Sequence, residues 1–175
     1  QLIQNTVVST VMANLGFNQA MEAAGITVIS TAVGDRYVLE SMREHGFVLG
    51  GEQSGHVVMS EFGTTGDGIL TALHLLARVC ASGKTLAELA GVVTKLPQVL
   101  INVGGVDRNA LGSNARVSAE LELLESALQG SGRILLRPSG TEPVIRVMVE
   151  AESQEWAQEV AEQLARVITA ELALD

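Results

Sequence analysis

Ten residues near the C-terminal end of the sequence bring together side chains that can bind phosphate. Arg137 and Arg146 supply two guanidinium groups, and Ser139 and Thr141 supply hydroxyls on either side of Gly140. A guanidinium group presents a planar fork of N–H donors that matches phosphate oxygens, and it stays charged at any cellular pH. Glycine lets backbone N–H groups turn toward an anion. The stretch therefore predicts a loop that holds a phosphate group.

The alternative interpretation of this stretch is an ordinary turn between two strands. Apolar runs at 133–136 and 144–149 flank the loop and are typical of strands. In that case the arginines would pair with the nearby carboxylates of Glu142 and Glu150. The residue types alone leave both interpretations open.

A second polar turn, at residues 50–56, has the chemistry of a sugar-binding loop. Glu52 can accept hydrogen bonds from sugar hydroxyls, and Ser54 can donate or accept them beside the flexible Gly55. His56 follows at the start of the next apolar run and could serve as an acid or base near neutral pH. The alternatives are a solvated hairpin and a histidine with a structural hydrogen bond.

Two further turns precede predicted helices. Asp35 and Arg36 follow an apolar run, and free N–H groups at such a helix start can bind anions with help from the arginine. Asp35 is equally well explained as a helix cap, and Asp67 in the similar run 64–68 is interpreted mainly as a cap. The histidines and Cys80 lack the spacing of metal ligands, so the sequence predicts no metal site.

Composition narrows the class of protein. The 175 residues are 47% hydrophobic but only 3% aromatic, with a net charge of −9. An acidic chain lacks the basic surface that general nucleic-acid binding requires, so no nucleic-acid partner is expected. No run of about 18 apolar residues predicts a membrane span, so no membrane partner is expected. The single cysteine, Cys80, lies on an apolar helical pattern and predicts a buried thiol in a reducing compartment, the cytoplasm.

The pattern of elements predicts an α/β chain of two domains. Residues 1–97 alternate strands and helices, which predicts a layered domain with a mixed sheet. Residues 98–175 predict a smaller α+β domain with an antiparallel-type sheet. Expected strands lie at 5–12, 26–33, 47–49, 56–60, 99–103, 133–136 and 144–149, and expected helices at 17–24, 35–45, 68–80, 86–94, 114–128 and 153–172. In the last helix we expect an inward stripe of Trp156, Val160, Leu164, Val167 and Ile168.

Together, these loops resemble the C-terminal half of the α-D-phosphohexomutases. The matching pieces occur in the family's order and span most of the chain: 5–8, 33–38, 50–56, 64–68 and 137–143. The resemblance implies the third and fourth of four domains. It implies that Glu52 and Ser54 grip sugar hydroxyls, and that Gly55, His56, Asp35 and Arg36 line the cleft. It also implies that Arg137, Ser139, Gly140, Thr141 and Arg146 hold the phosphate that is not transferred.

Two functional loops of that family are missing from the sequence: the phosphoserine loop of the first domain and the magnesium loop of the second. We therefore expect the substrate-recognition half of an enzyme that moves a phosphoryl group between two positions of one sugar. The half alone should be inactive, and Mg²⁺ should be required only by the full-length enzyme. The absence of an initial Met also indicates a fragment.

The resemblance implies two kinds of partner, a phosphorylated amino sugar and the missing N-terminal domains of the same chain. A homodimer is a further expectation. Two alternatives stay open: the same half of an enzyme for mannose or glucose phosphates, and a non-catalytic phosphosugar-binding module.

Overall fold

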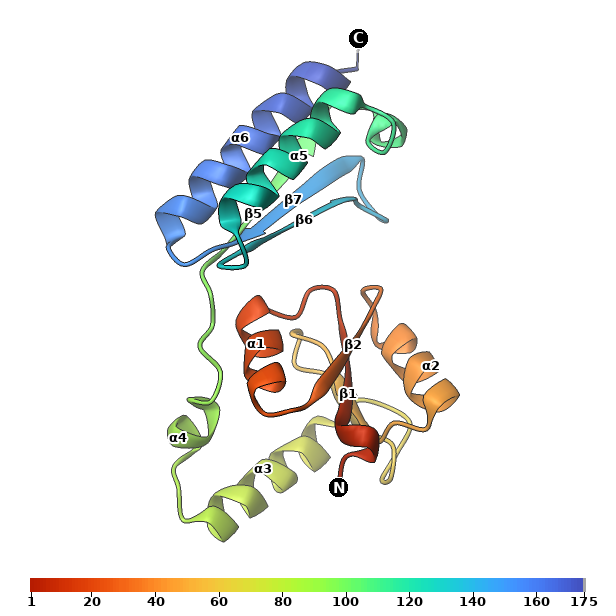
Figure 1. Cartoon of the computed structure of the whole chain (residues 1–175). Helices are drawn as coiled ribbons and strands as arrows, with labels where there is room; N and C mark the ends of the chain where they lie inside the picture. Colours follow the sequence, from red (N-terminus) through yellow and green to blue (C-terminus); the bar gives the residue numbers. More distant parts are fainter. Residues whose placement is uncertain (175) are drawn as a thin grey trace. The chain divides into compact units, whose positions relative to one another are not determined.

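The computed structural model describes residues 1–174, which form two compact units (Figure 1). Unit 1 is Gln1–Lys95, and unit 2 begins at Leu96. Each has its own sheet and its own helices, and the two are described separately below.

Unit 1 contains a four-stranded mixed sheet, as the sequence predicts. The strand order is β2-β1-β3-β4, in which β1 runs parallel to β2 and β3, and β4 is antiparallel to β3. In the parallel pair β1–β2, Thr6 lies opposite Thr27 and Thr10 lies opposite Thr31, so the C-terminal ends of both strands lie at the same edge of the sheet. The strands are β1 Thr6–Thr10, β2 Thr27–Thr31, β3 Leu49–Gly51 and β4 Val57–Met59.

Four helices accompany this sheet, and polar side chains fix where three of them begin. Asn14, Asp67 and Thr85 accept hydrogen bonds from the free N–H groups of α1, α3 and α4, as helix caps do. Helix α2 begins with Asp35 inside its first turn, and Gly34 occupies the cap position. The helices are α1 Leu15–Ala23, α2 Asp35–His45, α3 Gly68–Ser82 and α4 Leu86–Ala90.

The core of unit 1 lies between α2 and one face of the sheet. Val38 and Met42 of α2 pack against Val8 of β1 and Val58 of β4, together with Phe47. Strand β3 reaches this layer through Gly50, which is buried. The sequence predicts a polar turn beginning at residue 50, but Gly50 and Gly51 lie in the strand, and the turn spans only 52–56.

Replacing Gly50 with alanine is expected to destabilise unit 1 by about 1–3 kcal/mol, the usual cost of overpacking a well-filled core. A Cβ atom at position 50 would lie 2.7 Å from both Met42 Sδ and Val38 Cγ1 and 3.0 Å from the Val8 carbonyl oxygen. Urea unfolding should show the loss. Gly63→Ala is the matched control, because a Cβ atom there would meet nothing within 4 Å. Equal midpoints for the two variants would contradict the packing argument.

Unit 2 is a three-stranded antiparallel sheet with two helices against one face (Figure 1). The strand order is β5-β7-β6, so β7 is central and pairs on both edges. Together the two units confirm the predicted α/β class with one mixed and one antiparallel sheet. The elements are β5 Gln98–Gly104, α5 Ala115–Leu128, β6 Arg133–Pro138, β7 Val144–Glu150 and α6 Gln154–Leu172, with the short 3-10 helix η2 Arg108–Ala110 between β5 and α5.

The core of unit 2 is aliphatic, as the low aromatic content requires. Ile145, Val147 and Val149 of β7 pack under Val160 and Leu164 of α6. The predicted inward stripe of α6 is wrong in one member. Trp156 is 36% exposed, and Ala157, one position further along the helix, is fully buried in its place.

Helix α3 departs most from expectation. The sequence predicts an inward apolar face for α3 and a buried Cys80, but no residue of the helix is buried and Cys80 is exposed. None of the helices within residues 1–174 combines the length and the apolar character needed to cross a membrane.

Candidate functional site

The predicted phosphate loop joins the edge strand β6 to the central strand β7. Its backbone is closed by the Ser139 N–H, which donates to the Val144 carbonyl at 2.9 Å, and by the Glu142 N–H, which donates to Ser139 Oγ at 3.3 Å. Ser139 is only 4% exposed, while Gly140 and Thr141 lie exposed at the tip. The Ser139 hydroxyl therefore shapes the loop from inside. Thr141 and the backbone of Gly140 are left open to a ligand.

Two arginines flank the loop on neighbouring strands. Arg137 of β6 stands directly opposite Arg146 of β7 in the antiparallel register, so both side chains lie on one face of the sheet. Burial and, to a smaller extent, the charge of Arg146 lower the pKa of Arg137. Like charges directly across a strand pair are destabilising. Arg137 forms no ion pair within residues 1–174. An anion bound here would relieve that repulsion.

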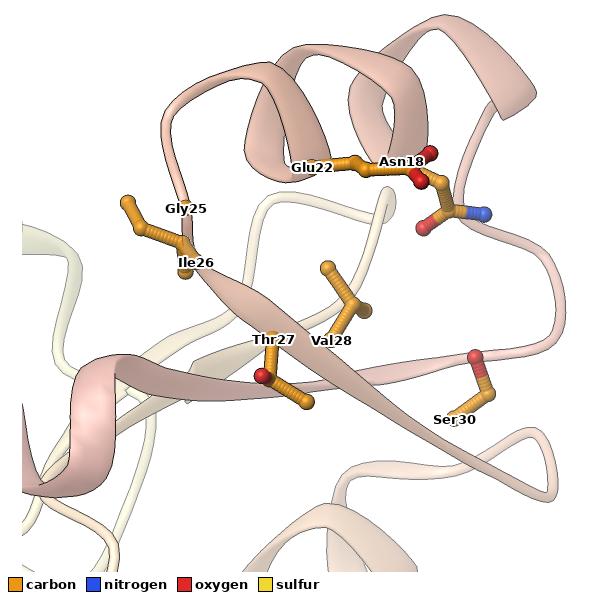
Figure 2. A pocket seen from close by; sticks show the side chains of 7 residues that line it. All are labelled: Asn18, Glu22, Gly25, Ile26, Thr27, Val28 and Ser30. Carbon is orange, nitrogen blue, oxygen red and sulfur yellow. The ribbon is translucent and has the colours of Figure 1, made fainter.

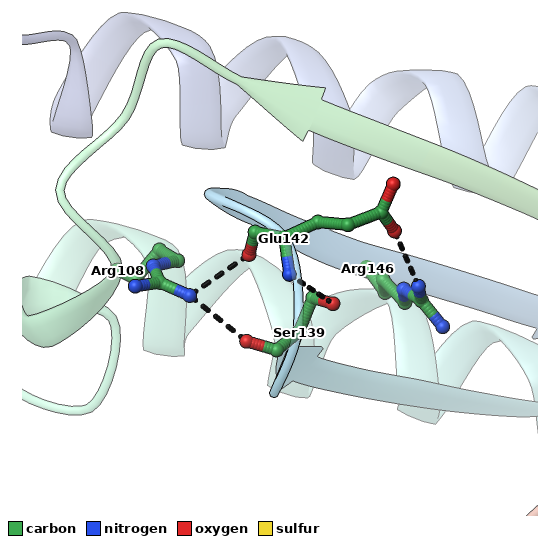
Figure 3. Close-up of polar contacts among 4 residues, drawn as sticks. All are labelled: Arg108, Ser139, Glu142 and Arg146. Carbon is green, nitrogen blue, oxygen red and sulfur yellow. Dashed lines mark hydrogen bonds and ion pairs between the residues drawn. The ribbon is translucent and has the colours of Figure 1, made fainter.

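Arg146 is held by a carboxylate from the loop itself (Figure 3). Its Nη2 atom lies 2.6 Å from Glu142 Oε2, and the Glu142 side chain is 55% exposed. The Nε atom of Arg146 is buried, with no hydrogen-bond partner among the described residues. Ion pairs at this level of exposure contribute about 0–1 kcal/mol, so a phosphate group could displace Glu142. The alternative of carboxylate pairing is thus correct for Glu142, whereas Glu150 pairs with Arg133.

A third arginine, Arg108 of η2, holds the loop from the other side (Figure 3). Its Nη1 atom donates to the carbonyl oxygens of Ser139 at 2.9 Å and Glu142 at 2.8 Å. One guanidinium nitrogen thus ties together the beginning and the end of the turn. The sequence interpretation missed Arg108, because 31 residues separate it from Ser139 and it lies in a glycine-rich stretch with no motif.

Replacing Arg108 with methionine is expected to loosen the loop and to weaken anion binding about tenfold, because two hydrogen bonds from a charged donor are lost. Amide hydrogen exchange at residues 139–142 should become faster without ligand, and Arg108→Lys should recover part of the protection. Arg116→Met is the matched control, since Arg116 is an exposed arginine on α5. If exchange at 139–142 is the same in the variant and the control, Arg108 does not position the loop.

In unit 1, three of the predicted polar turns converge. His56 Nδ1, at the end of the 52–56 turn, lies 3.7 Å from Asp35 Oδ2 at the start of α2. Gly66, in the run 64–68, packs against His56, since a Cβ atom on Gly66 would lie 3.2 Å from the histidine Cβ. Both partners of the His56–Asp35 pair are more than half exposed. Three separate segments of the chain therefore place an imidazole and a carboxylate together on an open surface.

The remaining predicted residues of unit 1 lie around this pair. The Glu52 N–H donates to the His56 carbonyl at 2.9 Å, and the Gly55 N–H donates to the Glu52 carbonyl at 3.1 Å, so the turn is tight. Gly55 has φ 98°, which favours glycine. Ser54 lies exposed at its tip.

Arg36 turns toward its neighbour Tyr37. Its Nη2 donates to Tyr37 Oη at 2.5 Å, and the guanidinium lies 4.4 Å from the ring centroid. The hydrogen bond to Tyr37 raises the pKa of Arg36. The cation is therefore held at the helix start next to Asp35 in sequence, and Arg36 as a whole is exposed.

Two hollows in unit 1 differ in the charged side chains that line them. One of about 480 Å³ is lined by Glu52 and Gln53 of the turn, by Lys95 and by apolar side chains, so it adjoins the predicted sugar-binding loop and carries one charge of each sign. The other, of about 520 Å³, lies between α1 and β2 (Figure 2). Its lining carries one charged side chain, Glu22, which would repel a phosphate. None of the predicted site residues lines it.

Among the described residues, no group of three or more His, Cys, Asp or Glu side chains could hold a metal ion. The carboxylates and histidines of the candidate site therefore do not make the donor set that Mg²⁺ takes in proteins.

The chain matches two family models along most of its length. Residues 1–96 match the model described as phosphoglucomutase/phosphomannomutase, alpha/beta/alpha domain III. Residues 75–167 match the model of the phosphoglucomutase/phosphomannomutase C-terminal domain. Both candidate loops, at 52–56 and 139–143, lie inside these matches.

Curated relatives and solved structures agree with these models. The chain is 61% identical to a phosphoglucosamine mutase of a Nocardioides species and 56% identical to one of Thermobifida fusca, over 99% of the chain and 39% of each relative. It therefore spans about two-fifths of their length. The fold is shared with the Aspergillus fumigatus N-acetylphosphoglucosamine mutase, with a TM-score of 0.82 at 23% identity over 97% of this chain and 39% of that one. Another structure of that fungal enzyme, at 20% identity and a TM-score of 0.76 over 96% of this chain and 39% of that one, holds GlcNAc-6P and magnesium.

Proposed function

Because the chain belongs to the phosphoglucomutase/phosphomannomutase family, we propose that it is the substrate-holding part of a phosphoglucosamine mutase. Such an enzyme interconverts glucosamine 6-phosphate and glucosamine 1-phosphate. Relatives named phosphoglucosamine mutase, between 54% and 61% identical to this chain, support the choice of sugar. The observation that carries the proposal is the pair Arg137 and Arg146, opposed across two strands, with one exposed carboxylate, that of Glu142, paired to Arg146.

In this proposal the loop of unit 2 binds the phosphate that stays on the sugar. Arg137 and Arg146 supply guanidinium forks, Thr141 supplies a hydroxyl, and Gly140 leaves room for backbone N–H donors at the exposed tip. Ser139 keeps the turn closed by accepting from the Glu142 N–H. The phosphate replaces the Glu142 carboxylate at Arg146, so one charge-assisted contact is exchanged for another.

Unit 1 supplies the contacts to the sugar ring. Glu52 accepts from a pair of neighbouring hydroxyls, and Ser54 and Gly55 extend the rim of the same turn. His56 and Asp35 form an acid–base pair that can take up or release a proton during phosphoryl transfer, with Arg36 adding positive charge beside them. The 3.7 Å separation of His56 and Asp35 supports this assignment.

The nucleophile and the charge neutralisation of transfer are assigned to the part of the longer protein outside this chain. Phosphoryl transfer needs a nucleophile and neutralisation of charge on the moving group. The described residues offer no metal cluster, so we place the Mg²⁺ site in that other part as well. The cytoplasm stays the proposed compartment, because an exposed, unpaired Cys80 is typical of reducing conditions.

A chimaera tests the proposal. The N-terminal part of the Nocardioides relative, joined before Gln1, should convert glucosamine 6-phosphate to glucosamine 1-phosphate, whereas the 175-residue chain alone should show no turnover. Mannose and glucose phosphates are assayed in parallel, and a preference for either would reassign the substrate. Turnover by the 175-residue chain alone would contradict the assignment of the nucleophile to the part of the protein outside this chain. An inactive but folded chimaera, beside an active Nocardioides enzyme, would contradict the function.

A further inference from the structure

Helix α3 carries an apolar stripe that nothing in unit 1 covers. We define the α3 stripe as Ile69, Leu73, Leu76 and Cys80, whose spacing of four, three and four residues places them on one face of the helix. Ile69 is 77% exposed, Leu73 59% and Leu76 60%, and Cys80 is exposed as well. Arg78 is the only charged residue in the fifteen-residue helix. A helix of this composition is typical of a buried position, not of a solvated surface.

The apolar surface extends beyond the helix. Phe62 precedes α3 and is 60% exposed, and its ring centroid lies 4.8 Å from that of His74 on α3. Leu86 and Val92 follow α3 in sequence and are also exposed. Large exposed apolar patches on folded proteins mark interaction sites. The segment 62–92 therefore presents a surface that requires a partner.

We propose that the α3 stripe docks against the portion of the longer protein that precedes this chain. The relatives are about two and a half times as long as the matched region, which covers 39% of them, and the matched family models are the third domain and the C-terminal domain. The portion outside this chain is thus large and lies on the N-terminal side. This inference concerns assembly and does not depend on which sugar the enzyme uses.

Charge favours this occupant over a second copy of the chain. Each copy carries a net charge of −9, so two copies repel one another, while the stripe itself contributes no charge that could offset the repulsion. A preceding domain of the same polypeptide is tethered, so its effective concentration at the stripe is high. Because the α3 stripe is apolar and uncharged, we expect the surface of that domain that contacts it to be apolar as well.

Cys80 provides a built-in reporter for this contact. Iodoacetamide labelling of Cys80, followed by peptide mass spectrometry, is compared in the 175-residue chain and in the chimaera with the Nocardioides N-terminal part. We expect labelling to be at least about tenfold slower in the chimaera, because a covered thiol reacts only after local opening. Ser118→Cys in a Cys80→Ser background is the matched control. Ser118 is exposed on α5 of unit 2 and should label at the same rate in both proteins.

A variant that places a charge in the α3 stripe tests whether the apolar contact itself protects Cys80. Leu73→Glu should restore fast labelling of Cys80 in the chimaera and leave the melting temperature of the 175-residue chain unchanged, because Leu73 is exposed there. If the chimaera does not fold, the Nocardioides part is added as a separate polypeptide, and saturable slowing of Cys80 labelling is expected.

Three outcomes would overturn the proposal. The first is equal labelling in the chain and the folded chimaera. The second is no slowing by the separate polypeptide. The third is protection in the chain alone that increases with its concentration, which would assign the stripe to a second copy. An inactive chimaera with a protected Cys80 would overturn the proposed function and leave the docking surface standing.

Discussion

Replacing Arg137 with methionine is expected to weaken phosphosugar binding about 100-fold, because hydrogen bonds from a charged donor contribute roughly 1.5–3 kcal/mol each. Arg137 has no ion-pair partner within residues 1–174, so its guanidinium fork is available to a ligand. Arg137→Lys should recover only part of the affinity, since an ammonium group keeps the charge but loses the planar fork.

The same change should not destabilise unit 2. Burial and the neighbouring Arg146 lower the pKa of Arg137, so the charged form is less favoured in the folded state than in the unfolded chain. Removing that charge relieves a cost of folding, and methionine keeps most of the apolar stem. We expect a melting temperature equal to or slightly above that of the original chain. Lost binding with retained stability is the signature of a ligand-binding arginine.

Two measurements test this pair of expectations. Titration with glucosamine 6-phosphate is followed by the amide signals of Gly140 and Thr141, and kcat/KM is measured in the chimaera. Arg116→Met removes one exposed arginine from the same unit and serves as the matched control. Free glucosamine tests whether the signals depend on the phosphate group. The assignment of Arg137 would be wrong if both variants bound glucosamine 6-phosphate equally well.

The elements of the chain could largely be predicted from the sequence because local signals mark them. Asp67 and Thr85 each cap the helix that the sequence predicts after them, and Asn114, predicted as the first residue of a helix, is the cap of α5. The start and end of α2, Asp35 and His45, match the expected range, since Gly46 ends the helix in the left-handed conformation. The alternating pattern of strands and helices likewise predicts the mixed sheet. These features depend on residues close together in the chain.

The errors in predicting buried residues share a physical cause. The spacing of apolar residues shows which face of a helix is apolar, but it does not show which other element packs against that face. The apolar face of α3 predicts burial, but its cover is not supplied by the described residues, so Cys80 is exposed. In α6 the pattern predicts Trp156 as inward, but small Ala157 fits the tight layer under the sheet and the bulky ring is displaced outward.

The contacts that shape the candidate sites are also long-range. Arg108 reaches a loop more than 30 residues away, and His56 meets Asp35 from a different segment. The residue types predicted polar loops at 50–56 and 137–143, of which the structure forms turns at 52–56 and 139–143. They did not predict which side chains hold those loops in place.

The second large effect is expected at a buried ion pair at the end of the β6–β7 hairpin in unit 2. Glu150 of β7 is fully buried, and its Oε2 atom accepts from Arg133 Nε of β6 at 2.7 Å. Removing one partner of a buried ion pair leaves a desolvated charge, which costs about 3–5 kcal/mol. Arg133→Met should therefore lower the free energy of unfolding of unit 2 by about 3 kcal/mol, the low end of that range, because Arg133 keeps some access to water.

Urea unfolding of the 175-residue chain measures this loss, and a second variant separates its cause from a packing defect. In the double variant Arg133→Met/Glu150→Leu both charges are replaced by apolar groups of similar size, a change that is often neutral or stabilising for buried pairs. The double variant should therefore be more stable than Arg133→Met alone. Because Arg133 and Glu150 lie at the opposite end of the hairpin from the 139–143 loop, chains of either variant that remain folded should keep their affinity for phosphosugar. A single variant as stable as the original chain would show that Arg133 is not the main source of stabilisation of the Glu150 carboxylate. A double variant less stable than the single one would assign the loss to packing.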